Sequence, residues 1–155
     1  MSNKMTVQLK KGDLFSQDVA CFVNPWNMNF IPWFLLLPHG VSGQLKKRAG
    51  LAPFNELLSK GVLKPGSAVL TTGGKLPQSI IHVAGLKWYW MTDLRIVEKC
   101  TRSALMLAVD KNIKSIAFPL IGAGVGGLKK GDVISVMEMV ALEKDWGMDI
   151  VIVEY

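Results

Sequence analysis

Hydrophobic and polar residues alternate with two different periods along the chain. Short apolar runs and runs of alternating polarity are typical of strands, whereas apolar residues three or four positions apart are typical of helices. The pattern predicts strands over residues 6–10, 20–23, 67–71, 79–84, 115–119 and 150–153. It predicts helices over residues 43–49, 53–59, 92–112 and 133–146, with Thr92 and Asp93 offering a cap for the third helix and Asp132 for the fourth.

Strands that alternate with helices predict a mostly parallel or mixed sheet that is covered on both faces. The chain has no internal repeat, no low-complexity stretch and no long linker, so residues 1–155 are expected to form one domain. In sheets of this kind, ligands bind at the carboxyl ends of the strands. This rule points to the segments that follow Val23 and Pro119.

The composition is that of a globular protein, with half of the 155 residues hydrophobic and 19% charged. The longest apolar stretch, Phe30 to Leu37, contains Pro32 and is far shorter than the roughly 20 residues that a membrane-spanning helix needs. The first residues show no secretory signal pattern. We therefore expect a soluble, cytoplasmic protein without a membrane span.

Cysteine and histidine are scarce, and their positions do not suggest a metal site. Cys21 and Cys100 each lie in an apolar segment, outside any CxxC pair, and are expected to be buried, reduced thiols. His39 and His82 are too few to complete a zinc site with them. We expect neither a metal nor a cofactor.

The net charge of +6 favours an anionic partner. Basic residues form three short clusters, which are either ordinary solvated surface or a means of attracting a phosphorylated small molecule: Lys10-Lys11, Lys46-Lys47-Arg48 and Lys129-Lys130. Nucleic acid is not the favoured partner, because the chain has neither an RNP-type aromatic pattern nor a KH loop.

A glycine-rich segment follows the predicted strand 115–119. Residues 121–127 read Ile-Gly-Ala-Gly-Val-Gly-Gly, and glycines let backbone N–H groups approach an anion without interference from Cβ atoms. A flexible turn is the other interpretation. The segment is not a P-loop, because no Gly-Lys-Ser/Thr follows. It is also not the dinucleotide-binding fingerprint, whose GxGxxG glycines follow a first strand near the N-terminus.

Polar residues also follow the first two predicted strands. Asn24 and Asn27 stand at the exit of the strand 20–23, where amides can bind hydroxyls or phosphates but where asparagine is also common in turns. Asp13, in Gly12-Asp13-Leu14-Phe15, is suited either to cap or turn the backbone or to accept hydrogen bonds from an exocyclic amine.

These pieces, in this order and approximate spacing, resemble the macrodomain family over nearly the whole chain. Gly12-Asp13-Leu14 resembles the family's Gly-Asp-Ile, Asn24 and Asn27 fall on the asparagines of Asn-Ala-Ala-Asn, and residues 79–85 resemble the strand that contains Val-Ile-His. Residues 40–43 resemble the end of the first phosphate loop, and residues 121–127 resemble the second phosphate loop. The resemblance implies a three-layer α/β/α sandwich with a mixed central sheet of about six strands.

The resemblance also implies a ligand, ADP-ribose or an NAD-derived relative, and a role for each matching segment. Asp13 and Leu14 would bind the adenine, on which Tyr155 would stack unless it is only a frayed terminal residue, and Asn24 and Asn27 would position the distal ribose. Backbone N–H groups of the two loops would bind the diphosphate: Gly40, Val41, Ser42, Gly43, Ile121, Gly122, Ala123, Gly124, Val125, Gly126 and Gly127.

Three departures from the family bear on function. Ser42 stands where hydrolytic members have an aspartate, Lys46 stands where they have a histidine, and Gly126 replaces an aromatic residue over the distal ribose. The first loop is also longer than usual and holds the apolar stretch Phe30 to Leu37, which would be a core plug, an interaction surface or a wall of the ribose pocket formed by Trp33 or Phe34.

The expected function is therefore recognition of ADP-ribose, either free or on an ADP-ribosylated protein. The competing interpretation is a hydrolase that removes ADP-ribose from an acidic side chain or an acyl group from ADP-ribose. With no aspartate at position 42, such a hydrolase would depend on a water held by Asn27 or by the substrate.

Overall fold

The computed structural model describes residues 5–27, 40–61, 63–86, 92–124 and 127–155, apart from the side chains of Asn27 and Leu86. Within these residues, six strands form one sheet in the order β1-β6-β5-β2-β4-β3. Their bounds are β1 Val7–Lys11, β2 Cys21–Asn27, β3 Ala68–Thr71, β4 Ser79–Leu86, β5 Ser115–Pro119 and β6 Asp149–Glu154.

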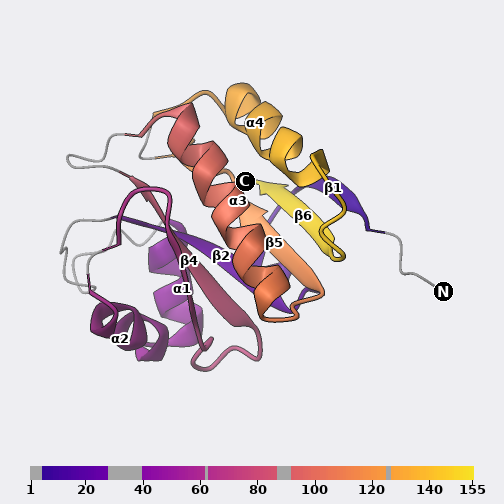
Figure 1. Cartoon of the computed structure of the whole chain (residues 1–155). Helices are drawn as coiled ribbons and strands as arrows, with labels where there is room; N and C mark the ends of the chain where they lie inside the picture. The colour runs from indigo at the N-terminus through magenta and orange to yellow at the C-terminus, as the bar shows by residue number, and fades with distance from the viewer. Residues whose placement is uncertain (1–4, 28–39, 62, 87–91, 125–126) are drawn as a thin grey trace.

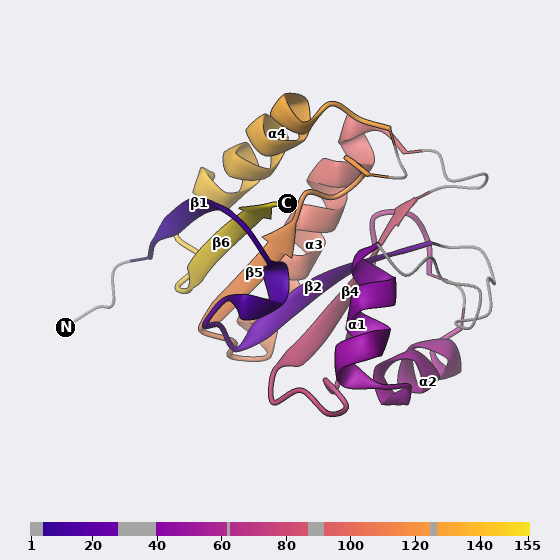
Figure 2. The same cartoon turned by 180° about the vertical axis from the view of Figure 1, so that it is seen from behind.

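Helices cover both faces of the sheet, so the predicted three-layer α/β/α sandwich is confirmed (Figures 1 and 2). One face carries α3 (Leu94–Asp110) and α4 (Lys130–Leu142), which lie side by side in Figure 1. The opposite face carries α1 (Val41–Ala49), α2 (Ala52–Ser59) and a short 3-10 helix, η1 (Leu14–Ser16), as Figure 2 shows.

The sheet is mixed, as predicted, but only at one edge. Every neighbouring pair of strands is parallel except β3 and β4, which are antiparallel. The carboxyl ends of β1, β6, β5, β2 and β4 consequently point to the same edge of the sheet. The segments that leave β1, β2, β5 and β6 are the ones in which the sequence predicted binding residues.

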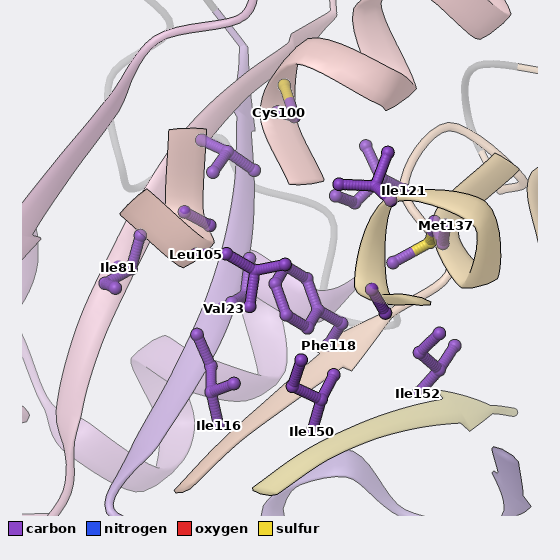
Figure 3. Close-up of a cluster of buried hydrophobic side chains, with 14 of the residues drawn as sticks. Val23, Ile81, Cys100, Leu105, Ile116, Phe118, Ile121, Met137, Ile150 and Ile152 are labelled. Atoms are coloured by element: carbon purple, nitrogen blue, oxygen red, sulfur yellow. The ribbon is translucent and has the colours of Figure 1, made fainter. Parts of the chain in front are cut away.

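The core beneath α3 and α4 is built from aliphatic residues that project from one side of the strands. Figure 3 shows Phe118 of β5 flanked by Leu105 of α3 and Met137 of α4, and all three side chains are fully buried. Cys21 and Cys100 lie in this core, unpaired as predicted, and their burial raises the pKa of each thiol to about 12. Both cysteines are therefore uncharged packing residues.

The opposite face of the same strands packs against η1, α1 and α2. Alternate residues of β2 and β4, such as Phe22 and Ile80, are buried on this side together with Leu45 of α1 and Phe54 of α2. Side chains of successive strand residues point to opposite faces, so both faces of the central strands are covered. Two polar residues, Asn24 and His82, share the buried face with these apolar side chains.

Several predicted boundaries were wrong, since α1 begins at Val41 and not at residue 43, and α4 spans Lys130–Leu142 and not residues 133–146. Strand β2 continues through Asn27 rather than ending at Val23, because parallel pairing with β4 extends along residues 21–27. Asn24 therefore lies in a strand and not in a turn. Asp132 does not cap α4, which starts three residues after the glycine-rich segment with Lys129 at the N-cap position; Asp132 instead lies in the first turn, near the positive end of the helix dipole.

Neither a membrane span nor a metal cluster is found among the residues described above. No helix there is both long and apolar enough to cross a bilayer. No three His, Cys, Asp or Glu side chains in this part of the chain are grouped closely enough to hold a metal ion.

Candidate functional site

The end of β2 is the point at which two of the predicted binding segments meet. Ser42, in the first turn of α1, donates a hydrogen bond from Oγ to the carbonyl oxygen of Pro25 over 3.2 Å. On the other side, a Cβ placed on Gly85 of β4 would lie 3.8 Å from Cβ of Pro25 and 3.0 Å from Cγ2 of Ile121. The start of α1 and the start of the glycine-rich segment thus both lie near Pro25.

Helix α1 begins with backbone N–H groups for which no side-chain cap is found among the described residues. Gly40 is the N-cap residue, and it has an extended backbone and no side chain to offer. The carbonyl of Gly40 accepts from the N–H of Gln44, the first hydrogen bond of the helix, so the amides of Val41, Ser42 and Gly43 precede the helical ladder. Uncapped N–H groups at the positive end of a helix dipole form a ready anion site.

The glycine-rich segment leaves β5 as a series of tight turns. Gly122 has a φ of +83°, and a Cβ on it would lie 2.8 Å from Cγ2 of Thr92, so only glycine fits this position without a shift. Ile121 is fully buried and anchors the segment in the core. Gly124, in contrast, is exposed, has no other heavy atom within 4 Å of an added Cβ, and lies outside the left-handed region. The chain is therefore open to solvent at Gly124.

Asp13 caps η1 and also forms an ion pair, so the first of the two roles considered for it is confirmed. Its Oδ1 accepts from the backbone N–H of Phe15 over 3.0 Å. Its Oδ2 lies 2.9 Å from Nη2 of Arg48, whose guanidinium also lies over the ring of Phe15 at 5.4 Å. The carboxylate remains partly exposed and keeps unused lone pairs, whereas the Leu14 side chain is buried beneath it.

Asn24 lies beneath the start of α1, and both ends of its side-chain amide are engaged within the protein. Its Oδ1 accepts from Ser42 Oγ over 2.9 Å, and its Nδ2 lies 3.0 Å from Nδ1 of His82. Only 1% of Asn24 is exposed. The residue is therefore placed to support the site from below.

His82 extends this set of contacts across the sheet to β3. Its Nε2 lies 2.8 Å from Oγ1 of Thr71, which in turn donates to the carbonyl of Thr72 over 3.0 Å. The ring is fully buried, with Phe54 of α2 at 6.3 Å between centroids. Burial lowers the pKa of His82 to about 3, so the imidazole is neutral at physiological pH.

Sequence reasoning missed the partnership between these residues and also the role of Arg48. The available signal was the polar Asn24 and His82 on otherwise apolar strand faces, but nothing in the sequence aligns β2 with β4. Arg48 was grouped with a basic cluster, although the structure pairs it with Asp13.

Several predicted residues lie at the same edge of the sheet or outside the described part of the chain. Tyr155 follows β6, is 98% exposed and accepts a hydrogen bond from Nζ of Lys130 at its carbonyl oxygen. Asn27 is the last residue of β2, but its side chain lies outside the described residues, as do Val125, Gly126 and the apolar stretch 30–37 with Trp33 and Phe34.

Comparison with known proteins decides the family. The model of the family described as "Macro domain" matches residues 23–137, which is well over half of the chain and includes both candidate anion-binding segments. The chain belongs to the macro domain family. The sequence-based assignment is thereby confirmed. The relatives of this macrodomain carry several different names.

Curated relatives cover most of this macrodomain. An O-acetyl-ADP-ribose deacetylase of Klebsiella pneumoniae is 35% identical over 126 residues, which span 77% of this chain and 69% of the relative. A macro domain-containing protein of Listeria monocytogenes is 36% identical over 133 residues, covering 81% of this chain and 73% of the relative. Relatives with these two kinds of name are thus about equally similar.

Solved macrodomains share the fold. The Oceanobacillus iheyensis macrodomain with ADP has a TM-score of 0.78 and 27% identity, with 100% of this chain and 86% of that chain covered. A mutant of the same protein with ADPR has a TM-score of 0.76 at 27% identity, with 99% and 87% covered. The macrodomain of Thermus aquaticus DarG, at 21% identity and a TM-score of 0.74, covers 97% of this chain and 99% of that chain and supports the fold alone.

Proposed function

We propose that this macrodomain binds ADP-ribose, free or attached to a protein, or a closely related NAD-derived ligand. One observation carries the proposal: the uncapped start of α1 and the open glycine-rich segment both lie around Pro25, at the carboxyl edge of the sheet. Two sets of backbone N–H groups on either side of one strand end suit a diphosphate better than a single phosphate. Similar proteins with ADP or ADPR bound support this choice.

The first set of donors is residues 40–43, and the second is residues 121–127. Because these groups belong to the backbone, they bind phosphate oxygens without requiring a basic side chain at the site. The net charge of +6 assists by attracting an anion over a longer range. Asn27, at the end of β2 between the two segments, is assigned to the distal ribose.

The adenine is assigned to the side of the edge where β1 and β6 end. Asp13 is the proposed acceptor for the exocyclic amine, through a lone pair not used by Phe15 or Arg48. Arg48 keeps this carboxylate oriented. Leu14 contributes through its backbone and through its packing beneath Asp13, and the exposed Tyr155 is free to stack on the base.

The proposal predicts measurable binding of ADP-ribose and much weaker binding of AMP. AMP keeps the adenine and one phosphate but leaves one set of N–H donors without an anion. Isothermal titration calorimetry with both ligands in the same buffer measures the difference, with adenosine as the control for the base alone. Equal affinities for AMP and ADP-ribose would contradict a diphosphate site, and no binding of ADP-ribose would contradict the proposal itself.

A second candidate function, hydrolysis of an ADP-ribosyl or acyl-ADP-ribose ester, is favoured by the relatives named O-acetyl-ADP-ribose deacetylase. The structure bears on which residue would serve it. Ser42 Oγ donates to Asn24 and Pro25, which offer only amide and carbonyl oxygens, so neither of these described partners is a base that could remove its proton. A water positioned by Asn27 is the proposed nucleophile.

If the protein is a hydrolase, Asn27→Ala should lower kcat by about 100-fold, the contribution typical of one positioned catalytic group. Ser42→Ala should act mainly on KM, because Ser42 shapes the anion site without taking part in proton transfer. Turnover of O-acetyl-ADP-ribose, followed by chromatography, provides both constants. Asn55→Ala, on the exposed side of α2, is the matched control and should leave both unchanged.

The same assay separates the two candidate functions. An unchanged kcat in Asn27→Ala would remove Asn27 from the chemistry. Binding of ADP-ribose by the wild type, together with no turnover of any ADP-ribosyl ester, would leave recognition as the function.

A further inference from the structure

We propose that His82 and Thr71 are positioning residues for the nucleotide site, although neither lies at its surface. Four side chains form one chain of hydrogen bonds from α1 to β3: Ser42, Asn24, His82 and Thr71. This chain of hydrogen bonds starts at the first turn of α1 and crosses β2 and β4 on the buried face of the sheet to reach β3. This inference rests on the proposed function and adds to it the residues that hold the first phosphate-binding segment in place.

The direction of the chain follows from its far end. The carbonyl of Thr72 only accepts, so Thr71 Oγ1 donates to it and must accept from His82. Nε2 of His82 is then the protonated nitrogen, and Nδ1 accepts from Nδ2 of Asn24. Asn24 Oδ1 is left to accept from Ser42 Oγ. Every donor along the chain therefore points away from α1 and toward β3.

This chain can position α1 because its members have little freedom. Asn24 and His82 are direct register partners on neighbouring parallel strands, and Thr71 is held by antiparallel pairing with Ile80 of the same strand, β4. Asn24, His82 and Thr71 are at most 4% exposed, so water does not compete for their hydrogen bonds. Ser42 is the one member of the four that belongs to a helix. Its hydroxyl therefore links the first turn of α1 to the other three members, which lie in the sheet.

The far end of the chain is itself fixed. Glu56 of α2 accepts from the backbone N–H of Thr72 over 3.2 Å and also from its hydroxyl. The carbonyl that receives the last hydrogen bond therefore belongs to a residue held by a second helix. Loss of any central member would leave buried donors or acceptors unpaired and would loosen Asn24, one of the two acceptors that hold the Ser42 hydroxyl. The orientation of the N–H groups in the first turn of α1 would then be less well fixed.

Thr71→Val tests this role, since valine keeps the shape of threonine and removes the hydroxyl. We expect ADP-ribose to bind about tenfold more weakly, the effect of losing one buried hydrogen bond of ordinary strength, with adenosine binding unchanged. Thr101→Val is the matched control, because Thr101 is equally buried but bonds only to Val97 within α3. Thr71→Ser, which restores the hydroxyl, should restore most of the affinity.

A double-mutant cycle distinguishes positioning from general destabilisation. If Thr71 acts through Ser42, Ser42→Ala and Thr71→Val should lower ADP-ribose affinity no further together than the more severe variant does alone. If the two losses of affinity instead multiply in the double variant, the proposal is overturned. Equal losses in Thr71→Val and Thr101→Val would also overturn it, because both would then reflect stability alone.

Nuclear magnetic resonance tests the chain without any ligand. In the wild type, the ¹⁵N shifts of His82 should show protonation at Nε2 and not at Nδ1, and Thr71→Val should shift the amide resonances of Ser42 and Gly43. Protonation at Nδ1, or unchanged amides in the variant, would overturn the inference even if ADP-ribose binds. Wild-type protein that fails to bind ADP-ribose but shows both signals would instead overturn the proposed function and leave the chain established.

Discussion

Replacing Gly124 by glutamate is expected to reduce ADP-ribose affinity by at least ~100-fold while leaving the fold intact. The substitution is sterically permitted, because Gly124 is exposed, has an ordinary φ and has open space where a Cβ would stand. Its carboxylate would lie among the N–H groups assigned to the diphosphate. Two unit charges of like sign 4 Å apart repel by about 4 kcal/mol at an effective dielectric constant of 20, and partial exposure reduces this figure.

The measurement is calorimetric titration with ADP-ribose, accompanied by a thermal melt to show that the variant is folded. Gly131→Glu is the matched control, since Gly131 also has an ordinary φ and no neighbour within 4 Å of an added Cβ. It lies in the first turn of α4, close to the glycine-rich segment but outside it, and should retain affinity within a few-fold. Wild-type affinity in Gly124→Glu would remove this segment from the binding site.

The second large effect is a loss of stability in acid that His82 is expected to cause. The pKa of His82 is lowered to about 3 in the folded protein, against 6.5 for an ordinary histidine. Between these values the unfolded chain carries a proton at this position and the folded protein does not, so acid favours unfolding. The contribution of His82 is fully present above about pH 6.5 and is lost as the pH falls from there toward 3.

Because His82 takes up a proton only in the unfolded chain, it should lower the free energy of unfolding by up to about 1.4 kcal/mol for each pH unit below 6.5. Urea denaturation at several pH values between 7 and 5 measures the slope, and His82→Gln should reduce it. Glutamine is chosen because its amide offers one acceptor and one donor, as the neutral imidazole does. The comparison uses slopes, so a less stable variant still gives an answer, and equal slopes would contradict a buried neutral His82.

The groups that contact His82 do not titrate in this range. Asn24, Thr71 and the ring of Phe54 are uncharged, and the nearest described acid in the chain of contacts is Glu56, which bonds to Thr72. Carboxylates titrate mainly below pH 5. Between pH 7 and pH 5, the change in the free energy of unfolding therefore reports protonation of histidine rather than of carboxylates.

Most of the fold was predictable from the sequence because its signals are local. The apolar periods placed the six strands and four α-helices of the described residues, and the alternation of the two predicted a covered, mixed sheet. One boundary that failed depended on another part of the chain, and another was a local misassignment of a cap. Strand β2 extends to Asn27 because β4 pairs with it, and α4 starts at Lys130, which made Asp132 a first-turn residue and not the cap.

For the candidate site, the sequence by itself determined which residue types were available. It supplied glycines whose backbone N–H groups can approach an anion, asparagines near the end of β2 and an aspartate after β1, since these properties belong to single residues and short segments. The order of these pieces along the chain also determined the family, which the match over residues 23–137 confirms.

Only the tertiary structure decided how these residues act on one another. Asn24 and His82 are 58 positions apart, and Asp13 and Arg48 are 35 apart, so no local pattern relates the members of either pair. The register of β2 against β4 brings Asn24 to His82, and the packing of α1 over the sheet brings Ser42 to Asn24 and Arg48 to Asp13. Such contacts depend on the relative placement of whole elements, which is fixed when the two cores pack and is not encoded in any one segment.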